Sequence, residues 1–171
     1  MTERLWAPWR MEYIDAAKDE PADGVECFLC AKPNEGDDER ALILARAETS
    51  YVVLNVYPYN PGHVLVAPNR HVGELEALTD AELMDSGHML QATVRVLNEA
   101  MAPDGFNAGL NLGRVAGAGV PGHVHWHVVP RWNGDTSFMP VLGDVRVLPE
   151  SLDQTYAKLK PVFDHLAAGR A

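Results

Sequence analysis

The sequence has few cysteines, few aromatic residues and no long apolar run. Only 2 of its 171 residues are cysteines and 8% are aromatic, so a small domain stapled by disulfides is not expected. No stretch approaches the roughly 18 consecutive apolar residues of a membrane-spanning helix, and the first residues lack the apolar region of a signal peptide. We therefore expect a cytoplasmic protein without a membrane partner, whose cysteines are thiols or metal ligands.

Positive charge is also scarce. The chain has 14 Lys and Arg against 24 Asp and Glu, which gives a formal net charge of −10. Non-specific binding to nucleic acids depends on Lys and Arg neutralising phosphates, so we expect no nucleic-acid polymer as a partner. A small anion remains compatible with this charge, because a few main-chain N–H groups, His or Arg side chains can bind it locally. The 7 histidines are the unusual feature of the composition.

The order of local patterns predicts an α+β fold. Apolar runs bounded by Pro, Gly or Asn predict strands at residues 41–45, 51–55, 63–67, 106–112 and 123–130. Thr79 and Glu82 form a capping-box pattern before apolar residues at helical spacing, which predicts a helix from about Asp80 to Met101. A second helix, interrupted near Pro161, is predicted at about residues 150–168. We expect a five-stranded antiparallel sheet with one long helix and one C-terminal helix.

A chain of this length is expected to form one domain. Within residues 1–171 we distinguish three parts: an irregular arm with the cysteines at 1–40, a catalytic core at 41–135, and a C-terminal extension with its helix at 136–171. The apolar face of the long helix is expected in the core, with a share in a homodimer interface. The apolar residues that define it are Leu83, Leu90, Val94, Leu97 and Met101.

Three histidines alternate with apolar residues at His123, His125 and His127. Alternate side chains of a strand share one face, so the three imidazoles are expected side by side. The simpler explanations are a solvent-facing polar strand or an incidental metal site. Imidazole is largely neutral and nucleophilic at pH 7, so a catalytic face is the favoured interpretation.

A glycine-rich segment, residues 113–122, lies directly before these histidines. Glycines allow main-chain N–H groups to converge on an anion, which makes a phosphate group the natural ligand of the neighbouring imidazoles. A flexible hairpin connection is the commoner role of such a loop. Its position next to the histidines is what favours phosphate binding.

Cys27 and Cys30 have the spacing of a zinc half-site. Two buried thiols or a redox pair are the alternatives. A redox pair favours the start of a helix, and Pro33 and Asn34 follow too soon to favour a helix there. The spacing alone leaves metal binding and these alternatives open.

Several of these motifs together resemble the histidine triad family. The resemblance rests on His-Val-His-Trp-His-Val-Val, on Asn55 and the run Pro61-Gly-His-Val-Leu-Val66, and on Gly117-Ala-Gly119. It extends to Trp6-Ala-Pro-Trp-Arg10, the cysteine pair and Pro130-Arg-Trp-Asn-Gly-Asp135, so it covers most of residues 6–150. The chain is most similar to the bacterial branch that contains diadenosine tetraphosphate phosphorylases, and it is distantly similar to galactose-1-phosphate uridylyltransferase.

The resemblance implies a role for each matched residue. His125 matches the nucleophile that forms a covalent nucleotidyl-histidine, His127 the residue that hydrogen-bonds the phosphate, and His63 a buried histidine that supports them. The implied nucleotide-binding residues are Asn55, at the ribose, and Asn111, Gly117 and Gly119, near the phosphates. The implied ligands of a zinc ion are Cys27, Cys30, His71 and His123. Such a four-ligand site leaves no position for water, so the zinc would be structural.

The implied activity is nucleotidyl transfer from diadenosine tetraphosphate or a related adenosine polyphosphate to inorganic phosphate. A hydrolase that uses water on the same substrates is the nearest alternative, and a non-catalytic nucleotide-binding regulatory module is an alternative of another class. The resemblance also implies a homodimer or a higher homo-oligomer.

The chain departs from the family pattern at two places. Compact family members have Gly-Gln-Ser/Thr-Val before the triad, whereas this chain has Gly117-Ala-Gly-Val-Pro-Gly122, so the phosphate donors are expected to be main-chain N–H groups. Ser137 stands where Asn is expected, and no catalytic role is assigned to it.

Two remaining histidines, His88 and His165, are interpreted as surface or packing residues. Three tryptophans are packing anchors or base-stacking residues, namely Trp6, Trp9 and Trp132.

Overall fold

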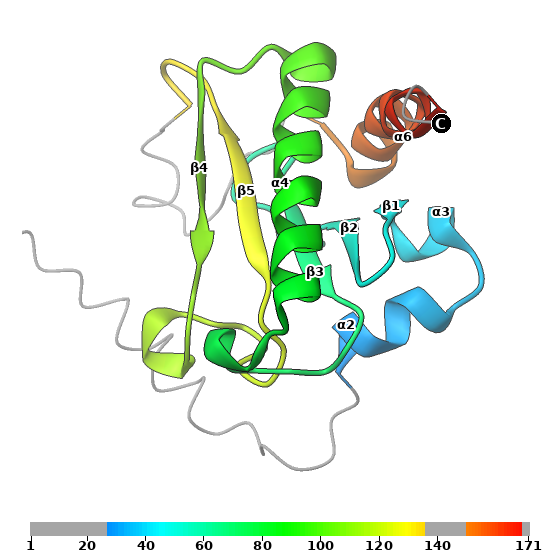
Figure 1. Ribbon diagram of the computed structural model, residues 1–171. Coiled ribbons are helices and arrows are strands. Elements are labelled where there is room, and N and C mark those ends of the chain that lie inside the picture. The colour runs from blue at the N-terminus through cyan, green and yellow to red at the C-terminus, as the bar shows by residue number, and fades with distance from the viewer. Residues whose placement is uncertain (1–26, 136–149, 169–171) are drawn as a thin grey trace, which may run out of the picture.

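The computed structural model describes residues 27–135 and 150–168. Its strands are β1 (Ile43–Arg46), β2 (Ser50–Leu54), β3 (Val64–Pro68), β4 (Gly105–Leu110) and β5 (Trp126–Arg131). They form one antiparallel sheet in the order β1-β2-β3-β5-β4, crossed by a long helix (Figure 1). The helices are α2 (Phe28–Ala31), α3 (Asp38–Ala41), α4 (Asp80–Met101) and α6 (Leu152–Ala168), with short 3-10 turns η1 (Lys32–Asn34), η2 (Leu75–Ala77) and η3 (Arg114–Ala116). The predicted α+β fold with a five-stranded antiparallel sheet is confirmed.

Helix α4 begins and ends where the sequence predicts. The Thr79 side chain accepts the Glu82 N–H, and the Glu82 carboxylate accepts the Thr79 N–H, which completes the predicted capping box. Most of its predicted apolar face lies in the core: Leu97 is buried and Leu90, Val94 and Met101 pack against the core, whereas Leu83 is 49% exposed. Among the described helices, none combines the length and the apolar character needed to cross a membrane.

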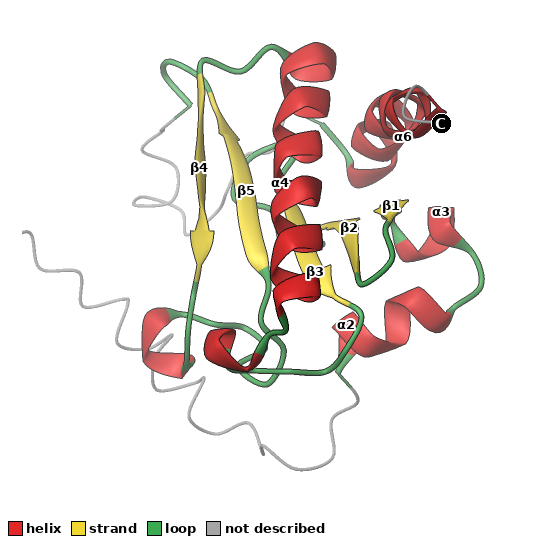
Figure 2. Ribbon diagram, in the orientation of Figure 1, coloured by secondary structure: helices red, strands yellow, loops and turns green. Residues whose placement is uncertain are grey.

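The two faces of the sheet have different coverings (Figure 2). Helices α4 and α6 pack on one face, where the larger apolar core contains residues of β2, β3, β5 and both helices. On the other face, a smaller core joins α2 to alternate residues of β2 and β3, such as Leu65. His127 lies directly opposite Leu65 in the β3–β5 pairing, so its side chain shares this second face. The imidazoles therefore lie away from the two long helices.

Helix α6 runs without a break through Pro161, so the predicted interruption is wrong. Proline removes one helical hydrogen bond and normally kinks a helix. Pro161 is exposed, and apolar residues on both sides of it, Leu159 and Phe163, are buried in the core. Packing against the sheet holds the helix together across this position.

Three short helical segments lie in the described part of the expected irregular arm at residues 1–40. They are α2, η1 and α3, and residues 1–26 lie outside the described part of the chain. Asp37 caps α3 by accepting the N–H groups of Glu39 and Arg40. Leu42 then takes a left-handed conformation (φ 61°), so strand β1 starts at Ile43 rather than at the predicted Ala41.

Candidate active site and metal centre

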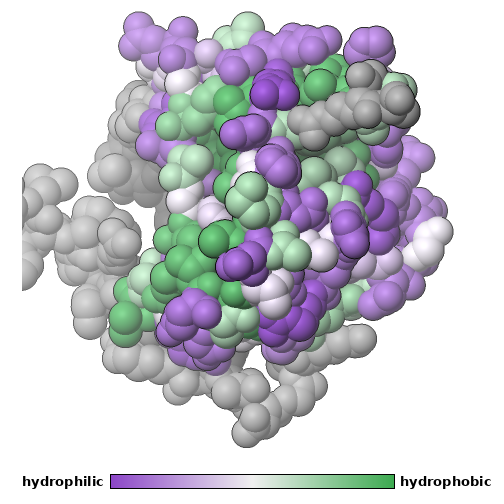
Figure 3. All heavy atoms as spheres, in the orientation of Figure 1, coloured by the Kyte–Doolittle hydropathy of each residue, from purple (hydrophilic) through white to green (hydrophobic). Residues whose placement is uncertain are grey.

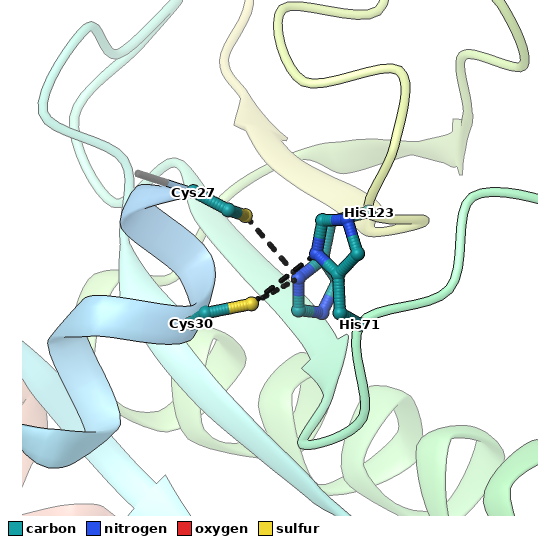
Figure 4. Close-up of side chains that lie close together, drawn as sticks. All are labelled: Cys27, Cys30, His71 and His123. Atoms are coloured by element: carbon teal, nitrogen blue, oxygen red, sulfur yellow. Dashed lines mark hydrogen bonds between the residues drawn. The ribbon is translucent and has the colours of Figure 1, made fainter. Parts of the chain in front are cut away.

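Cys27, Cys30, His71 and His123 come from three separate parts of the chain and meet at one point (Figure 4). The Cys30 Sγ lies 3.2 Å from Nδ1 of His71 and 3.4 Å from Nδ1 of His123, and the Cys27 Sγ lies 3.4 Å from the same His123 atom. All four ligand atoms lie within 4.8 Å of one another. A tetrahedral zinc ion bound to sulfur and imidazole nitrogen separates these ligand atoms by about 3.6 Å. The four residues therefore lie close enough to bind a metal ion, and their donor set suits zinc.

The cysteine pair is held by a short helix that the sequence analysis did not favour. Cys27 directly precedes α2 and Cys30 lies within it. The buried Tyr51 hydroxyl donates a 2.6 Å hydrogen bond to the main-chain oxygen of Leu29, between the two cysteines. Burial raises the pKa of Tyr51, so this hydroxyl keeps its proton and its role as a donor. Strand β2 thus fixes the position of the helix that carries Cys30.

The His71 segment is fixed to the start of helix α4. The Arg70 guanidinium donates from Nε and Nη2 to the Glu82 carboxylate, both at 2.8 Å, and from Nη2 to the Ala77 oxygen. Together with main-chain and hydroxyl bonds from Thr79, this ion pair lowers the pKa of Glu82 to about 2. The Val124 N–H donates to the Val72 oxygen at 2.7 Å, which joins the His71 segment to the histidine-rich segment.

His123 and His125 precede strand β5, which starts at Trp126 rather than at the predicted His123. The buried His123 ring has its Nε2 2.8 Å from the Pro68 oxygen, so Nε2 donates there and Nδ1 faces the cysteines without a proton. Its main-chain oxygen accepts a 2.7 Å hydrogen bond from Nδ1 of His125. His125 therefore holds its single proton on Nδ1 and has a lone pair on Nε2. Burial lowers the pKa of His125, which keeps the ring neutral.

His63 and His127 form a second pair of imidazoles with a defined proton arrangement. The Tyr59 main-chain N–H donates to Nδ1 of His63 at 3.1 Å, so a neutral His63 carries its proton on Nε2. That Nε2 lies 2.9 Å from Nδ1 of His127. His127 thus accepts at Nδ1 and carries its own proton on Nε2. Burial, with the neighbouring His125, lowers the pKa of His127 to about 4, so the His127 ring is uncharged at neutral pH.

Tyr59 lies in the turn that leads into β3, and the sequence analysis assigned it no role. Pro61 and Gly62 (φ 76°) occupy the centre of a turn closed by the His63 N–H and the Asn60 oxygen at 3.1 Å, as in a type II turn. The Tyr59 ring stacks on His127 with 6.0 Å between centroids and contacts His63 at 4.7 Å. A main-chain donor leaves no mark on the sequence, because every residue except proline carries one.

The residues implied for nucleotide binding lie in two loops. Asn55 accepts the Tyr57 N–H at its Oδ1, and its Nδ2 lies 3.3 Å from Nδ1 of His63. Asn111 donates to the Gly117 oxygen at 3.2 Å, and Gly117 has a left-handed conformation (φ 87°). Gly119 is exposed in the same loop. Asn111 thus shapes the glycine-rich loop from its start.

The remaining histidines, the tryptophans and Ser137 were also considered in the sequence. His88 and His165 are exposed, which confirms their interpretation as surface residues. Trp132 lines a cavity of about 690 Å³ beside the C-terminal end of α4, together with Met101 and Lys158. Trp6, Trp9 and Ser137 lie outside the described residues.

Three comparisons place the chain among known proteins. Residues 38–134, more than half of the chain, match the HIT domain family. A protein of Mycobacterium tuberculosis named AP-4-A phosphorylase is 42% identical over 156 residues, which cover 90% of this chain and 80% of that protein. A bis(5'-adenosyl)-triphosphatase of Dictyostelium discoideum is 30% identical, over 71% of this chain and 85% of its own. The crystal structure of a Zn-bound histidine triad family protein from Mycobacterium smegmatis superimposes with a TM-score of 0.67 at 26% identity, over 84% of this chain and 97% of that one.

Proposed function

The chain belongs to the HIT domain family, and we propose that it is a phosphorylase that cleaves diadenosine tetraphosphate or a related adenosine polyphosphate. The observation that carries the proposal is the hydrogen bond from Nδ1 of His125 to the His123 oxygen. It leaves the Nε2 lone pair of a buried, neutral imidazole for attack on phosphorus. The similarity to the Mycobacterium tuberculosis AP-4-A phosphorylase supports the same substrate class.

In the first step, His125 Nε2 attacks the α-phosphorus of the dinucleotide. A nitrogen–phosphorus bond forms, the bond from phosphorus to the bridging oxygen breaks, and ATP leaves from diadenosine tetraphosphate. His127 donates its Nε2 proton in a hydrogen bond to a phosphate oxygen, where negative charge increases. Its Nδ1 meanwhile accepts the hydrogen bond from His63. This bond fixes the orientation of the His127 ring and leaves the Nε2 proton for the phosphate.

In the second step, an oxygen of inorganic phosphate attacks the adenylyl-histidine. The nitrogen–phosphorus bond breaks, His125 regains its lone pair, and ADP is released. The covalent route divides one displacement into two. Water in place of phosphate would give AMP, which is the hydrolase alternative.

The nucleotide is expected to lie between the two loops next to the imidazoles. Asn55 is assigned to the ribose, while Asn111, Gly117 and Gly119 are assigned to the phosphates. The loop geometry supports the assignment to the phosphates. Gly117 has a left-handed conformation (φ 87°) that turns the loop, and Asn111 holds the loop there by its hydrogen bond to the Gly117 oxygen. Neutral imidazoles and main-chain N–H groups let an acidic protein of net charge −10 bind an anion locally.

A structural zinc ion is assigned to Cys27, Cys30, His71 and His123. Four protein ligands complete a tetrahedral site, so the ion would hold the α2 segment against the histidine-rich segment. Thiol ligands suit a reducing compartment, which agrees with a cytoplasmic location.

A homodimer is proposed through the edge of the sheet at β4. This outer strand pairs only with β5 among the described strands, and its middle residues are exposed. Figure 3 shows apolar side chains gathered at the lower left, beside the first half of α4 and the end of β4. Exposed apolar residues here are Leu83 and Met84 on α4, and Leu112 in the loop that follows β4. An edge strand next to an apolar patch favours pairing with a second copy; a monomeric mass by light scattering would refute this assembly.

The test of the activity is a product analysis. The protein is incubated with diadenosine tetraphosphate, with and without inorganic phosphate, and the nucleotides are separated by anion-exchange chromatography. ADP and ATP that form only with phosphate support the phosphorylase. AMP and ATP that form regardless of phosphate identify a hydrolase, and an unchanged substrate that nevertheless binds favours the regulatory module.

A further inference from the structure

The segment Pro130–Asp135 resembles a family motif, yet no chemistry has so far been assigned to it. Its last residue, Asp135, accepts four hydrogen bonds: from Nε and Nη2 of Arg131 at 2.6 and 2.7 Å, from the Trp132 N–H at 3.1 Å, and from Nδ2 of Asn60 at 2.7 Å. Three of these donors belong to the end of β5. The fourth, Asn60, belongs to the turn that leads into β3. Asp135 therefore joins the turn to the strand that follows the histidines.

Asn60 carries this connection into the turn. Its Nδ2 also donates to the Pro130 oxygen at 3.0 Å, so one side chain bonds two acceptors of the β5 end. Its main-chain oxygen accepts the His63 N–H. The neighbouring residue, Tyr59, donates its main-chain N–H to Nδ1 of His63 at 3.1 Å, and Nδ2 of Asn55 lies 3.3 Å from the same nitrogen.

The donors at His63 Nδ1 decide which imidazole nitrogen of His127 carries a proton, and the Tyr59 N–H is the nearer of the two donors. While this N–H donates to His63 Nδ1, His63 has its proton on Nε2 and donates to His127 Nδ1. If the Tyr59 N–H moves away, only the longer contact with Asn55 remains at Nδ1, and His63 can then carry its proton on Nδ1 and accept at Nε2. His127 must then donate from Nδ1, which leaves its Nε2 with a lone pair facing the phosphate oxygens. Such a histidine repels the phosphate instead of donating to it.

We propose that Asn60 and Asp135 are positioning residues that hold the Tyr59 N–H on His63 and thereby keep His127 as a proton donor at Nε2. The inference rests on the proposed function for the role of His127, but the proton arrangement itself is a property of the protein without substrate. Neither residue contacts His127 in the described hydrogen bonds. Both act through the turn.

The test combines turnover with the tautomers of the imidazoles. The variants are Asn60→Ala and Asp135→Ala, and the control is Asp164→Asn, which removes an exposed ion pair with Lys160 on α6. Long-range ¹H–¹⁵N spectra of protein labelled with ¹⁵N-histidine report which nitrogen of each ring is protonated. Replacing Asn60 removes two hydrogen bonds of a partly buried side chain, which is a small part of the stability of a folded domain, so this variant is expected to fold.

In the wild type, His63 and His127 are each expected as one Nε2–H tautomer. In both variants the two rings should show mixed tautomers, and kcat should fall on the order of 10²-fold with KM changed less than about threefold, because positioning is lost. Asp164→Asn should match the wild type. A loss of kcat with both rings still in the Nε2–H form would overturn the proposal, as would full turnover in both variants. If the wild type cleaves no dinucleotide, the proposed function fails, while the spectra still decide the tautomer arrangement.

Discussion

The main-chain oxygen of His123 accepts a 2.7 Å hydrogen bond from Nδ1 of His125, while Nδ1 of His123 faces Cys27 and Cys30. One residue therefore belongs to the candidate metal centre and also fixes the proton of the proposed nucleophile. Its ring is further fixed by the Pro68 oxygen at 2.8 Å. His123 therefore connects the candidate metal centre directly to the proposed nucleophile, His125.

Replacement of Cys30 is expected to lower both metal content and turnover. Cys30→Ala removes the sulfur next to both His71 and His123, so zinc should fall from about one ion per chain to a small fraction of that. A displaced His123 would misorient His125, and kcat should fall about 10- to 100-fold. Metal analysis by mass spectrometry and steady-state kinetics check this. Phe28→Ser, an exposed position between the cysteines, is the control, and normal turnover of a zinc-free protein would contradict the coupling.

Replacement of His125 is expected to abolish the covalent intermediate. His125→Ala removes the only proposed nucleophile, so kcat should fall on the order of 10³-fold or more. A substrate labelled on its α-phosphate should label the wild type in acid-free gels and leave His125→Ala unlabelled. His88→Gln, on the exposed side of α4, should behave as the wild type. Full turnover by His125→Ala would eliminate the mechanism.

Local patterns sufficed for much of the fold. The capping box at Thr79 and Glu82 placed the start of α4 correctly, since both of its hydrogen bonds depend on residues three apart. A four-residue helix such as α2 is too short to show a period, so its cysteines were interpreted as part of an irregular arm. The break predicted at Pro161 does not occur. Proline disfavours a helix locally, but the burial of Leu159 and Phe163 in the core keeps α6 continuous.

The candidate site was predictable where side chains carry the pattern. The four residues Cys27, Cys30, His71 and His123 meet as the resemblance implied. The proton arrangement was not predictable, because it depends on the Tyr59 N–H and the His123 oxygen. Main-chain groups are the same in every residue, so only the fold shows where they lie.

Acid is expected to weaken the anchor of the His71 segment. The pKa of Glu82 is about 2 in the folded protein against an ordinary value of 4.5, so the unfolded chain binds more protons between these values. Its contribution to stability is complete above pH 4.5 and is lost as the pH falls towards 2. Glu82→Gln keeps a side chain suited to the capping box but removes the ion pair with Arg70, which should cost about 1–2 kcal/mol at pH 7. Urea unfolding from pH 7 to pH 3 checks this. The difference between variant and wild type should shrink in acid, and a constant difference would contradict the assignment.

Two glycine substitutions are expected to change stability in opposite directions. Gly62 has φ 76°, and a Cβ there would lie 2.6 Å from Met101 Sδ and 3.2 Å from Pro130 Cγ. Gly62→Ala should therefore destabilise the protein by about 2–4 kcal/mol, because it combines an unfavourable conformation with a steric clash. It should also lower kcat, since the turn that places Tyr59 would shift.

Gly87 lies inside α4 with no atom within 4 Å of an added Cβ, so Gly87→Ala should stabilise by about 0.5–1 kcal/mol with unchanged turnover. Chemical denaturation with parallel kinetics distinguishes the two; equal stability of both variants would show that the turn tolerates a side chain at Gly62.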